Sequence, residues 1–249
     1  MEEPLLGYSG EKTATYKYIT HNFESEKAKK AFYLRLSLWI IILAFLILVN
    51  FINNFTSRTP ECTEDTIFEL SAPINTYFAE NPEVKNFFVI LSSFLLDVNL
   101  SFFMVIFILW GTSWRALTFA SSFYALRGYL QAMTVLGFPN GFIWEYPGIY
   151  SLLITYVRSS DFFYSGHVGM MLFTCIYFHN GNYNYLKYYS LFCLAFEACV
   201  MVFVRCHYSI DIIGAVLFCH YFWILSKYFA QYADYIGFNQ MSTNPITKP

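Results

Sequence analysis

Six long apolar segments dominate the chain, and the charged residues collect in the stretches between them. No charged residue occurs between Arg35 and Arg58, and none occurs between Asp161 and Lys187. An α-helix rises about 1.5 Å per residue, so about 20 residues cross a hydrocarbon core about 30 Å thick. The pattern therefore predicts six membrane-spanning helices, at about residues 36–55, 87–110, 116–135, 165–180, 188–205 and 210–229.

The composition agrees with a membrane protein. Of the 249 residues, 57% are hydrophobic and only 13% are charged, about half the roughly 25% of a soluble domain. We predict an all-α integral membrane protein, a six-helix bundle with a polar N-terminal segment (1–34), a catalytic membrane domain (35–230) and a C-terminal tail (231–249). The net charge of −2 gives no reason to expect a nucleic-acid partner. The chain has no CxxC pair, HExxH motif or P-loop, so we expect neither a metal nor a cofactor.

The distribution of Lys and Arg predicts the orientation of the chain. Ten of these residues fall before the first span, in the second and fourth loops and in the C-terminal tail, against four on the other side. Because basic residues are enriched in cytosolic loops, we expect both termini to be cytosolic and the loop 56–86 to lie on the opposite side. The protein is expected to be multi-pass, in an endomembrane (endoplasmic reticulum or Golgi) or the plasma membrane.

Two short polar stretches interrupt the apolar pattern at the same predicted membrane face. The first runs from Asp161 to His167 and the second from Arg205 to Asp211. His167 and His207 are 40 positions apart, which corresponds to two membrane crossings, so both histidines lie at one face, the non-cytosolic one. His207 and Asp211 are at positions i and i+4, so they share one face of a helix.

This arrangement suits phosphoryl transfer without a metal. A carboxylate at Nδ1 of His207 would hold the imidazole so that Nε2 is the nucleophile. A second histidine, His167, would protonate the leaving alkoxide and then deprotonate the incoming hydroxyl. Ser165 and Gly166 place backbone N–H groups at a helix N-terminus, where phosphate binds readily. We expect seven residues to bind substrate: Asp161, Tyr164, Ser165, Gly166, Arg127, Arg205 and Tyr208.

Three further ionisable residues lie at membrane depth, where such groups are costly. For Asp97 and Glu197 the favoured interpretation is structural, either as neutral acids or as partners of Arg127 that hold helices together. For Arg127 a structural and a functional role are both left open.

These stretches resemble the motifs of the lipid phosphatase and phosphotransferase (PAP2-like) superfamily, in particular its sphingomyelin synthase-like branch and the phosphatidylcholine:diacylglycerol cholinephosphotransferases. The branch carries Cys-Gly-Asp followed by Ser-Gly-His, and later His-Tyr-Thr-x-Asp. This chain has Asp161 six positions before His167, and His207-Tyr-Ser-Ile-Asp211. Arg115 and Arg127, twelve positions apart, resemble the arginines of the branch's third span, and Pro139 resembles the proline that follows that span. The likeness covers roughly 110–230.

The resemblance implies six transmembrane helices, His207 as nucleophile, Asp211 as its orienting partner and His167 as acid and base. The chain departs from the branch where Ser159-Ser160 replaces Cys-Gly, and Trp114 precedes Arg115 where the branch has a second arginine. The Ser-Arg pair of plain phosphatases before the second histidine is absent, because positions 200 and 201 are Val and Met. This difference favours a transferase over a phosphatase.

The leading hypothesis is transfer of a phospho-headgroup, phosphocholine by preference, from a glycerophospholipid donor to a lipid-hydroxyl acceptor, diacylglycerol or ceramide, through a phosphohistidine on His207. One alternative is a lipid phosphate phosphatase that uses water as acceptor. A second is a non-enzymatic membrane subunit that retains the fold. The sequence leaves oligomerisation and membership of a larger assembly open.

Overall fold

The computed structural model describes residues 26–55, 65–154, 156 and 162–238, and these form seven helices. Each of the six segments expected to be helical overlaps one of them. The additional helix, α3, lies in the segment 56–86 that was expected to be a loop. The bounds are α2 Glu26–Phe55, α3 Thr66–Glu80, α4 Pro82–Trp110, α5 Arg115–Met133, α6 Gly166–Asn180, α7 Asn184–Phe203 and α8 Ser209–Phe238.

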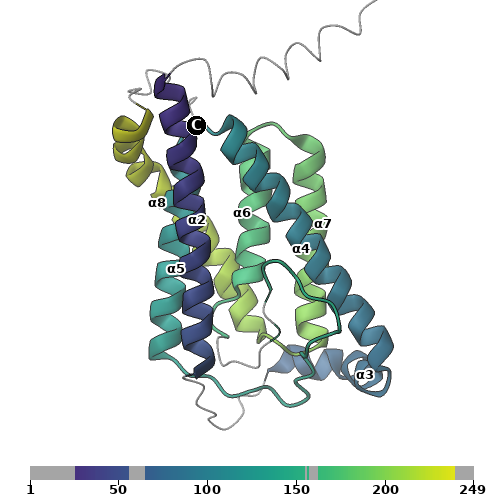
Figure 1. Ribbon diagram of the computed structural model, residues 1–249. Coiled ribbons are helices and arrows are strands. Elements are labelled where there is room, and N and C mark those ends of the chain that lie inside the picture. The colour runs from purple at the N-terminus through teal and green to yellow at the C-terminus, as the bar shows by residue number, and fades with distance from the viewer. Residues whose placement is uncertain (1–25, 56–64, 155, 157–161, 239–249) are drawn as a thin grey trace, which may run out of the picture.

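The long helices run side by side as a bundle, and α3 lies across one end of it (Figure 1). The short helix α6 packs against α7, α8 and α4 and so occupies the centre. Stacked and edge-on aromatic rings fill the core around it: the rings of Phe119 and Phe173 stack with centroids 4.4 Å apart, and Phe103 meets Phe173 edge-on at 4.9 Å. Burying three such large rings stabilises the contacts of α6 with α4 and α5.

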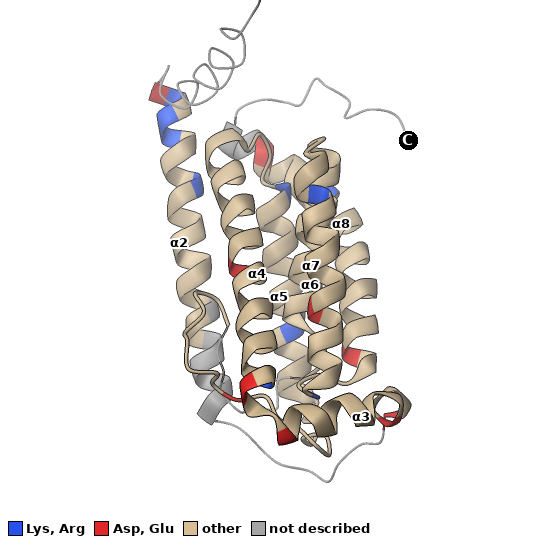
Figure 2. Ribbon diagram, turned by 90° about the vertical axis from the view of Figure 1, so that its right-hand side faces the viewer, with Lys and Arg blue, Asp and Glu red and all other residues tan. Residues whose placement is uncertain are grey.

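Three helices are long and apolar enough to cross a membrane within the described residues: Pro82–Trp110, Asn184–Phe203 and Ser209–Asp234. Figure 2 shows long uncharged stretches along the helices, with few charged residues between the two ends of the bundle. These features indicate a membrane protein. The six-span topology and its orientation stay predictions.

Several helices extend beyond the hydropathy boundaries. Helix α2 begins ten positions before the predicted start at 36, and α8 ends nine positions after 229. The proposed segment boundaries at 34/35 and 230/231 therefore fall inside helices. Hydropathy locates only the apolar part of a helix, and polar turns that continue into the headgroup region keep their backbone hydrogen bonds.

A long connection, 134–165, joins α5 to α6, and hydrogen bonds link it to the end of the bundle where α3 lies. The Asn75 amide of α3 donates hydrogen bonds to the carbonyls of Gly141 (3.0 Å) and Phe203 (2.7 Å). The N–H of Ile143 donates to the Val204 carbonyl at 3.0 Å. These bonds join α3, the connection and the end of α7 at the face where the two histidine motifs lie.

Candidate active site

The two predicted catalytic histidines lie next to each other at one end of the bundle. His167 is in the first turn of α6, and His207 precedes α8 by two residues. Their ring centroids are 6.2 Å apart and the rings are nearly perpendicular, at 81°. Phe162 meets the His207 ring edge-on at 6.3 Å. The two imidazoles are therefore near neighbours, although they are 40 positions apart in the sequence.

Asp211 lies behind His207 as the i,i+4 spacing predicts. Its Oδ2 is 3.3 Å from Nδ1 of His207 and accepts a hydrogen bond from the backbone N–H of Tyr208 at 2.9 Å. Both Asp211 and His207 are buried. A buried carboxylate at Nδ1 favours the tautomer with its proton there, which leaves the Nε2 lone pair for a nucleophilic role.

Ser165 connects the two histidine-bearing segments. Its backbone N–H donates to the carbonyl of Asp211 at 3.2 Å, and its hydroxyl caps α6 by accepting from the N–H of Val168 at 3.4 Å. One residue therefore fixes the start of α6 against the first turn of α8. Its N–H is engaged by the Asp211 carbonyl, and a contact of Ser165 or Gly166 with phosphate stays a prediction.

Arg127 approaches this helix start from α5. Its Nε donates to the Tyr164 carbonyl at 2.7 Å, and a Cβ added to Gly166 would lie 3.3 Å from the same nitrogen. Glycine at 166 lets the guanidinium come this close to the backbone. The arginine thus supplies positive charge beside the N-terminus of α6, one residue from His167. These contacts are compatible with either role left open for Arg127, and its contact with substrate stays a prediction.

Both tyrosines predicted to contact substrate have hydroxyls that donate to backbone carbonyls. Tyr164 donates to Phe123 at 2.6 Å and Tyr208 to Gly137 at 2.8 Å. Burial raises the pKa of the Tyr164 phenol, which therefore remains a donor. These bonds indicate a structural role for both hydroxyls, and a contact of either ring with substrate stays a prediction.

The remaining predicted site residues divide into two cases. The Arg205 guanidinium donates to the backbone carbonyls of Asn140 and Phe68, the latter at 3.0 Å, so it ties the long connection to α3. Its contact with substrate stays a prediction. Asp161 lies outside the described residues.

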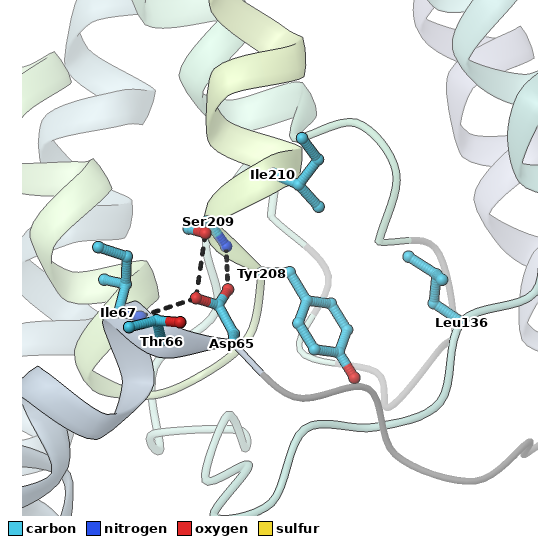
Figure 3. Close-up of a pocket in the computed structure, with 7 residues that line it drawn as sticks. All are labelled: Asp65, Thr66, Ile67, Leu136, Tyr208, Ser209 and Ile210. Atoms are coloured by element: carbon cyan, nitrogen blue, oxygen red, sulfur yellow. Dashed lines mark hydrogen bonds between the residues drawn. The ribbon is translucent and has the colours of Figure 1, made fainter.

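Sequence reasoning did not find the role of Asp65, which Figure 3 shows beside a pocket between the starts of α3 and α8. Asp65 Oδ1 caps α3 by accepting from the N–H of Ile67 at 2.9 Å, and Oδ2 accepts from the N–H of Ser209 at 2.6 Å. One carboxylate therefore satisfies the starts of two helices. The pocket, about 270 Å³, is lined by Asp65, Thr66, Ile67, Leu136, Tyr208, Ser209 and Ile210.

The two acids at membrane depth differ in what they contact. Asp97 accepts hydrogen bonds from the Ser151 hydroxyl (2.9 Å) and the Leu152 N–H (2.8 Å), which fits the structural interpretation. Glu197 accepts a hydrogen bond from the Ser92 hydroxyl and lies 3.9 Å from Nδ1 of His167. Sequence reasoning missed this proximity to a site histidine. Among the described residues no cluster of three or more His, Cys, Asp or Glu side chains is suited to a metal ion.

Apolar helices and a polar site of two histidines and an aspartate define a helical membrane protein equipped for acid–base and nucleophilic chemistry. A family model described as AtPDCT1/2, the phosphatidylcholine:diacylglycerol cholinephosphotransferase family, matches residues 64–228. The chain belongs to this family. The match covers every helix from α3 to the middle of α8, and with it every predicted site residue. No curated protein and no solved structure gives a significant match.

Proposed function

We propose that this protein transfers phosphocholine from phosphatidylcholine to the free hydroxyl of diacylglycerol, through a phosphohistidine on His207. Family membership supports the substrate class. The observation that carries the mechanism is the 6.2 Å separation of the His167 and His207 rings, with Asp211 at the far nitrogen of His207. A nucleophile and a proton donor on opposite sides of one phosphate is the arrangement that a double displacement needs.

In the first step, Nε2 of His207 attacks the phosphorus of phosphatidylcholine. The P–N bond forms while the bond between phosphorus and the glycerol oxygen breaks. His167, protonated at the start, gives its proton to the departing alkoxide, which leaves as diacylglycerol. The carboxylate of Asp211 stabilises the positive charge that develops on the His207 ring, because it stays ionised and accepts a hydrogen bond from the Nδ1–H group.

In the second step, a different diacylglycerol supplies the acceptor hydroxyl. Neutral His167 removes the hydroxyl proton as the oxygen attacks phosphorus, and the P–N bond to His207 breaks. The products are a new phosphatidylcholine, a protonated His167 and a free His207, so the site returns to its starting state. Arg127, beside the start of α6, provides positive charge for the phosphate oxygens in both steps.

The proposal places this site at the non-cytosolic face of a six-span bundle. Both substrates are bilayer lipids, so they would reach the histidines from one leaflet without leaving the membrane. Such access favours a lipid hydroxyl over water as the acceptor. Ceramide and water are the competing acceptors that a direct assay must distinguish.

The test uses purified full-length protein in vesicles that contain phosphatidylcholine labelled in the choline headgroup and an unlabelled diacylglycerol of different chain length. Label should appear in the new phosphatidylcholine species, and His207→Ala should abolish both this transfer and the covalent phosphoenzyme. Full transfer by His207→Ala would overturn the mechanism.

The choice of acceptor follows from parallel vesicles. Replacement of diacylglycerol by ceramide should give little labelled sphingolipid, and omission of any acceptor should give little free phosphocholine. Rapid release of phosphocholine without an acceptor would identify a hydrolase. A wild-type protein with no transfer and no release would favour a non-enzymatic subunit.

A further inference from the structure

A second carboxylate, that of Glu197, faces the histidine pair from α7. The side chain is only 3% exposed and lies in an otherwise apolar stretch of that helix. One oxygen, Oε2, accepts a hydrogen bond from the Ser92 hydroxyl of α4. The other, Oε1, is buried, accepts no hydrogen bond from the described residues and lies 3.9 Å from Nδ1 of His167. An ionisable group at this depth is costly and calls for a reason beyond packing.

The position of Glu197 at His167 parallels that of Asp211 at His207. In each pair a carboxylate oxygen lies at the Nδ1 side of an imidazole, at 3.9 Å and 3.3 Å respectively. The His167 side chain is 29% exposed although its Nδ1 is buried, so the accessible edge of the ring is the one away from Glu197. That edge carries Nε2, the atom that must exchange a proton with the lipid oxygen.

We propose that Glu197 is a positioning residue for the acid–base group His167. Its carboxylate orients the imidazole through Nδ1 and stabilises the imidazolium form that protonates the leaving diacylglycerol. At 3.9 Å the contact is too long for a hydrogen bond and is an ion pair when His167 is protonated. Catalytic contacts that are long without substrate often tighten in the substrate complex. The inference rests on the proposed function, because it assigns Glu197 a part in the same proton transfer.

Ser92 completes the arrangement from a third helix. Its hydroxyl hydrogen bond fixes Oε2, and therefore the direction in which Oε1 points. A carboxylate held on one side by a donor and directed at an imidazole on the other orients that ring without blocking its reactive nitrogen.

Among the described residues, the other charged or titratable groups around His167 do not supply this anion. Arg127 of α5 lies against Gly166, and its positive charge disfavours a second positive charge on His167. His207 faces the His167 ring from the residues just before α8. Asp211 is directed at His207, and the carboxylate of Asp97 in α4 is bonded to Ser151 and Leu152 of the long connection. From that same connection Trp144 packs 6.3 Å from the His167 ring and 5.5 Å from Tyr156, whose hydroxyl donates to Ser93. Glu197 thus offsets the charge of Arg127 at His167.

The experiment compares Glu197→Gln with wild type in the vesicle assay across a range of pH. Gln keeps the shape and can still accept from Ser92, so a merely structural role predicts wild-type kinetics. We expect phosphoenzyme formation to slow by about 10- to 100-fold at neutral pH, since general acid catalysis contributes about 10²- to 10⁴-fold. Because the imidazolium loses its anionic partner, the alkaline fall in rate should also move to lower pH.

Two variants act as controls. Glu197→Asp keeps the charge one methylene further away, and should restore part of the rate and return the alkaline limb toward the wild-type position. Asp97→Asn makes the same carboxylate-to-amide change in a helix that packs against α6 and α7, and should lower stability without moving the pH profile. If Glu197→Gln does not fold, Ser92→Ala takes its place, because it removes the donor that fixes Oε2; a wild-type rate and pH profile for Ser92→Ala would then refute the inference.

The outcomes separate this inference from the proposed function. Wild-type rates and an unshifted alkaline limb in Glu197→Gln, together with an inactive His207→Ala, would refute the role of Glu197 and leave the transferase mechanism intact. Full transfer by His207→Ala would overturn the proposed function itself.

Discussion

The backbone N–H of Ser165 donates a hydrogen bond to the carbonyl of Asp211 at 3.2 Å, and this bond joins the helix that carries His167 to the helix that orients His207. Ser165 directly precedes α6, and Asp211 lies in the first turn of α8. The helical hairpin of α6 and α7 separates the two residues along the chain. Because both are fully buried, the bond is shielded from competing water. The relative position of the two histidines therefore depends partly on a main-chain contact.

Replacing Ser165 with Pro should separate the two histidines, because proline lacks the N–H that Asp211 accepts. The φ of −60° at Ser165 suits proline, so the backbone of α6 itself need not change. We expect transfer to fall by at least about 10-fold, because misplacement by about 1 Å can cost about 100-fold. Ser165→Ala keeps the N–H and loses only the cap, so its loss of rate should be smaller. Equal rates for the two variants would contradict this prediction.

Changing Asp211 to Asn should lower transfer by about 10²- to 10⁴-fold, since the amide neither fixes the His207 tautomer nor stabilises its positive charge. Initial rates in vesicles measure the effect, with phosphoenzyme formation as the partial reaction. Asp234→Asn is the matched control on the same helix. Asp234 accepts from the Ser113 hydroxyl and the Trp114 N–H at the far end of α8, so its loss should affect stability and not rate.

Arg127→Lys should reduce transfer by about 10-fold or more, although the charge is retained. Arginine uses Nε to donate to the Tyr164 carbonyl while its planar guanidinium lies along Gly166. Lysine has a single ammonium group and cannot make both contacts. Arg115→Lys provides a control in the same helix. Arg115 stacks on Trp223 at 3.9 Å and donates to the Trp223 carbonyl, away from the histidines. A similar loss of rate in both variants would indicate a general effect of α5 on folding.

Asp65→Ala should lower stability by about 1–3 kcal/mol, because it removes the cap of α3 and leaves the first N–H of α8 without its acceptor. Ser209→Ala removes only the hydroxyl bond to the same carboxylate, 3.0 Å long, and should cost about 0.5–1.5 kcal/mol. Thermal unfolding of the detergent-solubilised protein gives both values. A smaller effect for Asp65→Ala than for Ser209→Ala would refute the double-cap assignment.

Gly141→Ala should destabilise the protein for two separate reasons. Its φ of +76° is unfavourable for alanine, and the added Cβ would lie 2.5 Å from Oδ1 of Asn75 and 2.8 Å from the Arg205 guanidinium. Gly148→Ala isolates the first cost, because φ is +100° there and no atom lies within 4 Å of the added Cβ. The melting temperature should fall further for Gly141→Ala, and equal shifts would show that the crowding is relieved at no cost.

Hydropathy located the helices of the bundle, but it gave no sign of α3. With 15 residues, this helix is shorter than the about 20 that a membrane crossing needs, and it includes Pro73. Two of its four buried residues, Ser71 and Asn75, are polar, so a search for membrane-length apolar runs does not find it. Its stability comes from the Asp65 cap and from packing of its buried side chains against α7 and α4. The cap is local to the segment, but the packing against α7 depends on residues distant in the sequence, which a pattern along one segment does not contain.

The pairing of His207 with Asp211 was predicted from a spacing of four positions on a helix. The contact forms, although His207 lies two residues before α8 and only Asp211 lies in its first turn. Charge counting likewise singled out Glu197 as an exception in an apolar helix. It did not indicate that Glu197 faces His167, since that depends on how α6 and α7 are rotated against each other.

The sequence by itself therefore determined where the long helices lie, which residues are candidates for the chemistry, and that both histidines belong to one face. Those properties follow from hydropathy and from residue spacing along a regular helix. Only the tertiary structure decided the 6.2 Å spacing of the imidazoles and the hydrogen bond from Ser165 to Asp211. It also decided that the Arg205 guanidinium donates to backbone carbonyls. These contacts join separate helices and loops, and the packing of side chains across their interfaces sets their relative rotation and depth.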